Sequence, residues 1–329
     1  MRKNFLAALC CMVMLVGCQQ AEEIENISEK LPMAIEASIE SSMGSRYASN
    51  SDDGTPSSLK FSSGDEIGVF VNNKAAAKWT KGEGDNWSST PSTIYWPDKV
   101  NNHSFYAFYP YKEASSKTSV PMPSLAKQTG TIESLSTCDF MVATALSKKY
   151  TDDNGKISFT GETNCFKHVS SLVAITILKE SDLKESTITK ISFEGTDTGL
   201  GSTTTYSFDT KIVTTNTDID KVESDILEVS MAKVETDQTL YFILNSGANL
   251  ANVTFSIEYK IGETKYIATK EGLGNNNLTS GNRYNFNLNI TDGVLNISGC
   301  EIEGWGEGSK MEDIIINTPE QQSQNNENT

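Results

Sequence analysis

Short runs in which apolar and polar residues alternate follow one another along most of the chain. Residues 33–39 place Met, Ile, Ala and Ile on one face and mostly polar residues on the other, and residues 253–259 and 284–290 repeat this arrangement. Successive side chains of a strand point to opposite faces, so a period of two predicts half-buried strands. Residues 103–109 (His-Ser-Phe-Tyr-Ala-Phe-Tyr) are apolar at almost every position, which predicts a strand covered on both faces.

Turn-forming residues separate these runs at short intervals. Residues 66–71 and 93–96 are further strand candidates, and Gly262 is placed to join two later strands in a hairpin. No long stretch has the helical period of 3.6, and only residues 182–186 favour a helical turn. Roughly seven short strands before Thr163 and eight or nine after it favour β-sandwiches over one large barrel. We therefore expect an all-β protein with two sandwich domains.

The first residues have the pattern of an export signal. Arg2 and Lys3 precede an apolar run, residues 5–16, that is too short to span a bilayer as a helix. The order Leu-Val-Gly-Cys at 15–18 resembles the lipobox of bacterial lipoproteins. This implies a signal peptide (1–17) cleaved between Gly17 and Cys18, acylation of Cys18, and a lipid anchor in the outer membrane. An ordinary secretory peptide in which Cys18 has no role is the alternative.

Residues 18–32 are polar and acidic, which is typical of a tether. Acidic residues directly after a lipidated cysteine resemble the export signals that send some Bacteroidetes lipoproteins to the outer face, and a plain linker is the alternative. The chain has 43 acidic and 27 basic residues, a formal net charge of −16. Because nucleic-acid binding needs basic patches, we expect no nucleic-acid partner.

The residue types that carry chemistry are few and scattered. Cys138, Cys165 and Cys300 remain after the signal peptide, at spacings that indicate neither a disulfide framework nor a zinc site, so buried free thiols are expected. His103 and His168 both adjoin apolar strands and are interpreted as structural. There is no phosphate-binding glycine loop and no nucleophile elbow. We expect no catalytic residue, metal or cofactor, and hence no enzyme.

Five motifs follow one another in a specific order. They are Phe-Ser-Ser-Gly-Asp-Glu-Ile-Gly-Val-Phe at 61–70, Ile-Tyr-Trp-Pro at 94–97 with Phe-Tyr-Ala-Phe-Tyr-Pro-Tyr at 105–111, Asp-Phe-Met-Val-Ala at 139–143, Phe-Lys-His-Val-Ser-Ser-Leu at 166–172, and Leu-Thr-Ser-Gly-Asn-Arg-Tyr-Asn-Phe at 278–286 with Ile-Glu-Gly-Trp at 302–305. Together they resemble the landmarks of the fimbrillin-like family of Bacteroidetes, whose members are pilus subunits and related surface lipoproteins.

The resemblance covers roughly residues 60–305. It implies two tandem transthyretin-like Greek-key β-sandwich domains, here residues 33–163 and 164–310, followed by a polar tail at 311–329. It also implies a stalk, tip or anchor subunit of a cell-surface fimbrium that serves adhesion, with other fimbrial subunits as partners in a homo- or heteropolymer.

Assembly in this family implies a removable N-terminal strand. An extracellular arginine- or lysine-specific protease cuts it away, and the open groove accepts a strand of another subunit, which satisfies free backbone groups and apolar pockets together. In this chain the removable strand is expected at 33–46, and Arg46, in a Ser/Gly/Asn-rich loop, is the candidate cleavage site. Lys60 is the second candidate, and an ordinary loop arginine is the alternative for Arg46. The apolar residues expected to exchange on the N-terminal side are Met33, Ile35, Ala37 and Ile39.

The donor strand has a candidate near the C-terminus. Ile314, Ile315 and Ile316 form a short apolar run between polar segments, and such a run favours docking to a partner. The alternative is a last strand of the chain's own second domain.

A second hypothesis is a lipid-anchored surface module that does not polymerise and binds a glycan or a host protein. Trp79 and Trp87, if exposed, could stack on sugar rings. The alternative is that both belong to the core of a hairpin.

Overall fold

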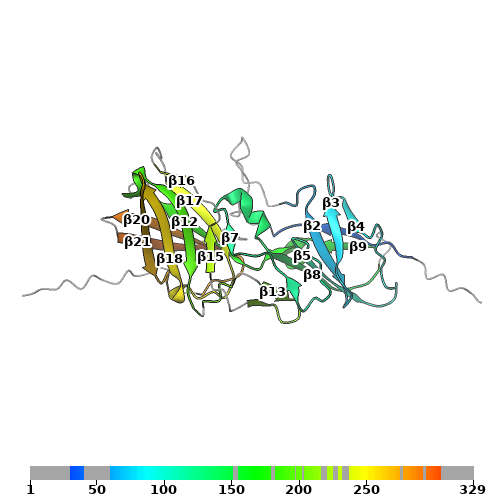
Figure 1. Ribbon diagram of the computed structural model, residues 1–329. Helices are drawn as coiled ribbons and strands as arrows, with labels where there is room; N and C mark the ends of the chain where they lie inside the picture. The colour runs from blue at the N-terminus through cyan, green and yellow to red at the C-terminus, as the bar shows by residue number, and fades with distance from the viewer. Residues whose placement is uncertain are drawn as a thin grey trace, which may run out of the picture. The chain divides into compact units, whose positions relative to one another are not determined.

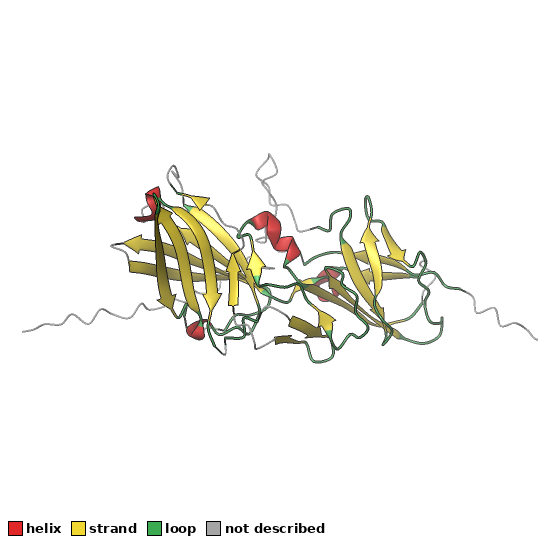
Figure 2. Ribbon diagram, in the orientation of Figure 1, coloured by secondary structure: helices red, strands yellow, loops and turns green. Residues whose placement is uncertain are grey.

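A computed structural model describes the chain at residues 30–40, 60–150, 155–178, 182–196, 198–201, 204–215, 221–224, 229–231, 237–274, 277–291 and 294–304 (Figure 1). The described residues from Leu31 onward belong to one compact unit. Strands dominate the described chain and helical turns are few and short, so the fold is all-β, as the alternation predicts (Figure 2).

The strands have the following bounds in the first half of the chain: β1 Ala34–Ala37, β2 Glu66–Val71, β3 Ala77–Lys81, β4 Trp87–Thr90, β5 His103–Tyr109, β6 Val120–Pro121, β7 Lys127–Gln128, β8 Met141–Lys148 and β9 Lys156–Phe159. In the second half they are β10 Lys167–His168, β11 Ser171–Ile177, β12 Thr187–Glu194, β13 Thr204–Ser207, β14 Ile212–Thr215, β15 Lys221–Ser224, β16 Val229–Ser230, β17 Gln238–Leu244, β18 Thr254–Ile261, β19 Thr264–Glu271, β20 Asn282–Thr291 and β21 Val294–Gly304. The helical turns are η1 Ile132–Thr137, α1 Gly161–Asn164, η2 Asp182–Glu185 and η3 Leu250–Asn252.

A six-stranded sheet, β10-β8-β5-β2-β3-β4, is the centre of the first half. Its strand β5 is covered on both faces, as predicted, because Phe105 belongs to one buried cluster and Phe108 to another. Gly68 on β2 is paired with Phe108, and a Cβ atom at Gly68 would lie 2.2 Å from the Phe108 ring. The glycine in the Gly-Asp-x-Ile-Gly-Val-Phe motif therefore makes room for a core aromatic ring.

Two sheets pack around the core of the second half. One has the order β17-β11-β20-β21 and the other β19-β18-β12-β15-β7, with β16 pairing β12 at the side. Phe242 and Phe286 of the first sheet join Phe193 and Phe255 of the second in one buried cluster. The period-two pattern of β18 and β20 thus buries one face of each, and β18 and β19 form the predicted hairpin across Gly262.

Two short strands before residue 163 pair with later strands. β6 pairs antiparallel with β13, and β7 pairs parallel with β15. Leu125 and Leu135 lie in the buried cluster of the second half. The domain boundary at 163–164 and the tandem transthyretin-like topology stay predictions. A boundary there would leave β6 and β7 on one side and their partner strands β13 and β15 on the other.

The strand expected at 93–96 is wrong as an independent element. Tyr95 lies in an isolated antiparallel bridge with Pro32 and not in a strand. Pro91 and Pro97 flank this stretch, and proline has no N–H group to donate to a sheet. The turn expected at 182–186 is confirmed as η2. Within the described ranges, every helix is too short to cross a membrane.

Candidate functional site

Residues 31–40, here called the N-terminal segment, lie between two other stretches of backbone. On one side β1 pairs parallel with β9, with Ala34 beside Lys156 and Ala37 beside Phe159. On the other side Met33 N donates to Ile94 O at 2.8 Å, and Trp96 N donates to Leu31 O at 2.9 Å. The N-terminal segment is therefore hydrogen-bonded to residues 94–96 through Leu31 and Met33, and to β9 from Ala34 onward.

The pairing continues past the end of β1. Ser38 N donates to Phe159 O at 3.0 Å, and Phe166 N donates to Ser38 O at 2.9 Å. Glu40 N then donates to Phe166 O at 2.8 Å. The segment thus follows β9 and the residues after it over almost its whole length. We call the space that it fills, between residues 94–96 and residues 155–166, the strand groove.

The side chains of the N-terminal segment fill the same space. Four of its apolar residues are buried, and they share one cluster with Ile67, Val69 and Phe105 of the central sheet. These four are Leu31, Met33, Ile35 and Ile39. Ala37 is only half-buried and packs at the margin of the cluster. The predicted face of alternating apolar residues therefore exists, with Ala37 as its least buried member.

Gly155 closes one end of the strand groove. Its carbonyl accepts a hydrogen bond from Trp96 Nε1 at 2.7 Å and one from Ala34 N at 3.3 Å. The residue has φ +61°, and a Cβ atom there would lie 2.7 Å from Pro32 O. Only glycine fits both this backbone conformation and this close approach.

Charged side chains line the outer face of the N-terminal segment. Glu36 forms an ion pair with Lys156, and Glu40 forms one with Lys167 at 2.9 Å. Hydrogen bonds from Lys156 and Ser158 hold the pKa of Glu36 below its ordinary value. Lys156 belongs to β9 in the groove wall and Lys167 to β10 directly after it, so each carboxylate reaches from the segment to one of these strands.

Most of the residues predicted for processing and for the donor strand lie outside the described residues, and Lys60 lies within them. Gly17, Cys18, Arg46 and the run 314–316 lie outside the described residues. Lys60 is described and exposed, but it directly precedes Phe61, which is buried. The Phe61 ring contacts three other aromatic rings edge-on, with centroid distances of 5.0–5.6 Å: Phe166, Trp87 and Tyr109.

The glycan hypothesis requires Trp79 to be exposed, and in the structure its side chain is buried. It is 2% exposed and belongs to the buried cluster beneath the strand groove. Trp87 is half-buried, 5.3 Å from the Phe61 ring, with Lys81 Nζ 5.8 Å from its own ring centroid. Both tryptophans lie on the β3–β4 hairpin, where Trp79 pairs with Ser89, and the hairpin-core interpretation therefore holds for Trp79.

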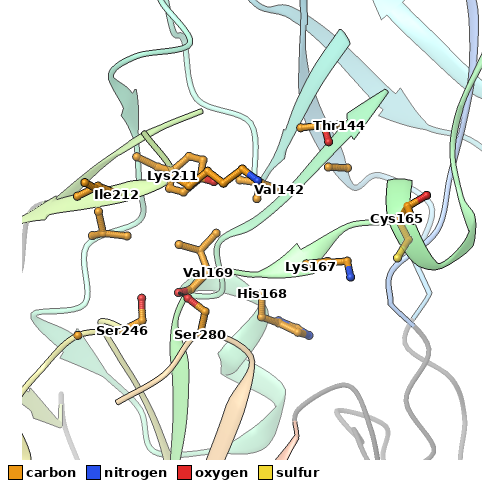
Figure 3. A pocket seen from close by; sticks show the side chains of 15 residues that line it. Val142, Thr144, Cys165, Lys167, His168, Val169, Lys211, Ile212, Ser246 and Ser280 are labelled. Atoms are coloured by element: carbon orange, nitrogen blue, oxygen red, sulfur yellow. Dashed lines mark hydrogen bonds between the residues drawn. The ribbon is translucent and has the colours of Figure 1, made fainter. Parts of the chain in front are cut away.

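A pocket of about 700 Å³ borders β10 (Figure 3). Strands β8, β10 and β14 contribute Val142, Lys167 and Ile212, and Ser246 and Ser280 come from loops of the second half. Among the described residues that line it, there is no carboxylate. Lys167 belongs both to this pocket and to the ion pair with the N-terminal segment.

The histidines and cysteines make structural contacts. His168 Nδ1 lies 2.9 Å from a carboxylate oxygen of Asp139, and both residues are buried. His103 Nδ1 lies 3.1 Å from Asn72 Nδ2. The three cysteines are buried and free, as predicted, and burial raises the pKa of the Cys300 thiol to about 12. No group of three or more His, Cys, Asp or Glu residues that could hold a metal occurs within the described ranges.

Comparison with known proteins agrees with the resemblance that the five sequence motifs indicate. The fimbrillin-like family model matches residues 48–305, and the chain therefore belongs to the fimbrillin-like family. The candidate fimbrium subunit Fim1C of Bacteroides uniformis is 24% identical over an alignment of 330 positions that covers 94% of this chain and 96% of that protein.

Two crystal structures share the fold. A candidate cell adhesion protein of Bacteroides ovatus has a TM-score of 0.57 at 16% identity, covering 84% of this chain and 98% of its own. A second one, from Bacteroides uniformis, has a TM-score of 0.54 at 18% identity, covering 84% of this chain and 99% of its own. At these identities the likeness concerns the fold alone.

Proposed function

We propose that this protein is a subunit of a cell-surface fimbrium that serves adhesion, and that it assembles by strand exchange after proteolysis. Membership of the fimbrillin-like family and the similarity to a candidate fimbrium subunit support the fimbrial role. One structural observation supports the exchange: the N-terminal segment is hydrogen-bonded to residues 94–96 at its start and to β9 and Phe166 along the rest, with its apolar side chains in the core.

Loss of this segment would leave backbone groups of the strand groove without hydrogen-bond partners and would expose apolar side chains of the groove to water. The carbonyls of Ile94, Phe159 and Phe166 would lose their donors, and the N–H groups of Trp96 and Phe166 would lose their acceptors. The apolar wall that now covers Ile35 and Ile39 would meet water. An incoming strand restores hydrogen bonds and apolar burial together, which is the driving force of strand addition.

The cut falls at Arg46 in this proposal. Proteolysis is concentrated at loop tips with small and polar residues, and Arg46 lies in a Ser/Gly/Asn-rich stretch of the sequence. Lys60 is a poorer substrate because Phe61 is fixed in the core immediately after it. Cleavage at Arg46 would separate the whole N-terminal segment from the rest of the chain and leave Phe61 in place.

The anchor and the partners follow from the same proposal. Acylation of Cys18 attaches the newly exported chain to the outer membrane, and cleavage after Arg46 releases the polymerising part from that lipid. The partners are an extracellular arginine-specific protease and other fimbrial subunits. The donor strand comes from one of those subunits, with the run 314–316 as the candidate from the sequence.

The test uses lipid-free protein that begins after Cys18. An arginine-specific protease should cut it at Arg46, because the other arginine left in that chain, Arg283, lies within β20 with its Nε 2.7 Å from Asn285 Oδ1. We expect a ladder of oligomers that resists mild SDS, and no ladder from the matched variant Arg46→Gln. Complete cleavage at Arg46 that yields only monomers would refute homopolymerisation by strand exchange.

A further inference from the structure

We propose that Lys156 and Lys167 select the incoming strand by its charge. The strand groove fits a segment with two carboxylates four residues apart and with apolar residues directly before each of them. This inference rests on the proposed strand exchange and specifies its partner: an acidic, apolar strand of another subunit that runs parallel to β9.

The direction of the incoming strand follows from the two walls of the groove. β9 pairs in parallel with the N-terminal segment, whereas the bridge between Pro32 and Tyr95 is antiparallel. Parallel and antiparallel ladders have different hydrogen-bond patterns, so a strand of opposite direction would mismatch the bonds on both sides. A replacement that forms the bonds now made by Ser38 and Glu40 has to run in the same direction as the segment that it replaces.

The register follows from the buried side chains. Met33, Ile35 and Ile39 are buried, while Glu36 and Glu40 each come one residue after a buried isoleucine. A shift by one residue would move every side chain of a strand to the opposite face. The apolar pockets therefore fix which positions of an incoming strand lie beside the two lysines.

The charge preference comes from those two positions. Lys156 pairs with Glu36 and Lys167 pairs with Glu40; the two glutamates are half-buried and the two lysines are exposed. Exposed ion pairs add little affinity, but like charges placed side by side across strands are repulsive. Lysine at either position of an incoming strand would thus be rejected, and this kind of rejection is a common source of specificity.

The same criteria disfavour the isoleucine run at 314–316 as the donor. With any of its three isoleucines at the position of Ile35 or Ile39, no register places carboxylates at the positions of both Glu36 and Glu40. The residues after the run include Pro319, which cannot donate a backbone hydrogen bond. In a homopolymer this tail would therefore be a weaker donor than a strand of another subunit that carries both carboxylates.

The experiment measures the binding of labelled decapeptides to protein cleaved after Arg46, by fluorescence anisotropy at low salt. The first peptide has the sequence of residues 31–40, and the second carries E36K and E40K. We expect the second to bind about tenfold more weakly, with the difference shrinking at 1 M salt because screening weakens exposed charge pairs.

A charge-reversed protein completes the design. In the double variant Lys156→Glu, Lys167→Glu the order of the two peptides should invert, and Lys265→Glu on the exposed edge strand β19 serves as the matched control that leaves the order unchanged. An inverted order also shows that the double variant is folded. Equal binding of both peptides to the wild-type protein would overturn the charge selection, whereas binding of neither peptide would overturn strand exchange itself.

Discussion

Replacing Ile35 by alanine should weaken the packing of the N-terminal segment in the strand groove. Ile35 is 5% exposed, lies within the buried cluster of the central sheet and pairs in register with Ile157 of β9. Replacing a buried isoleucine by alanine costs about 2–5 kcal/mol of folding free energy, and less where the surroundings can close over the cavity. The segment lies near the surface, so we expect about 2–3 kcal/mol for Ile35→Ala.

Urea unfolding of the uncleaved protein, followed by tryptophan fluorescence, measures this cost. Trp96 is a local reporter, because its backbone N–H bonds Leu31 and its ring N–H bonds Gly155. The matched control is Ile212→Ala on β14, where the side chain is 58% exposed and the cost should stay below about 0.5 kcal/mol. If Ile35→Ala and Ile212→Ala shift the transition equally, the segment does not fill a stabilising groove and the reasoning is refuted.

Three further predictions concern other parts of the fold. Gly68→Ala should destabilise the protein by about 1–3 kcal/mol in urea unfolding, because the added methyl group collides with the buried ring of Phe108; unchanged stability would contradict the pairing of β2 with β5. Three lysines around Glu223 on β15, one of them from β7, lower the pKa of its carboxyl to about 2. Since this folded-state pKa lies below the ordinary value of 4.5, the stabilisation is present above pH 4.5 and is lost as the pH falls towards 2. The stability difference between wild type and Glu223→Gln should therefore disappear over that range in acid unfolding curves, and a constant difference would argue against it. A thiol reagent at pH 8 should label Cys300 only after unfolding, because burial raises the pKa of this thiol to about 12 and excludes the reagent; rapid labelling of the folded protein would contradict this.

Local alternation was sufficient to predict individual strands. The apolar face of residues 33–39, the doubly covered strand 103–109 and the hairpin across Gly262 all follow from side-chain periods within one short stretch. The period reports burial at each position and needs no knowledge of the partner. The free thiols of the three buried cysteines follow from the wide spacing of these residues in the sequence.

Contacts between distant stretches could not be predicted. The parallel pairing of β1 with β9 joins residues more than a hundred positions apart, and no local pattern specifies it. The same holds for β7, whose partner β15 lies in the later half, and for the bridge between Pro32 and Tyr95. The sequence left Trp79 open between a ligand-binding surface and a hairpin core, and only the pairing within the sheet places its ring in the core. The ion pairs of Lys156 and Lys167 depend on this long-range pairing and were missed for the same reason.

The central claim is that the N-terminal segment gives way to a strand of another subunit. The most direct measurement is the N-terminal residue of the chain in fimbriae sheared from the cell surface, within oligomers that resist mild SDS. The account predicts that chains which hold a partner strand begin at Tyr47, directly after the Arg46 cut. Assembled chains of this kind that still begin at Cys18 and retain residues 31–40 would contradict it.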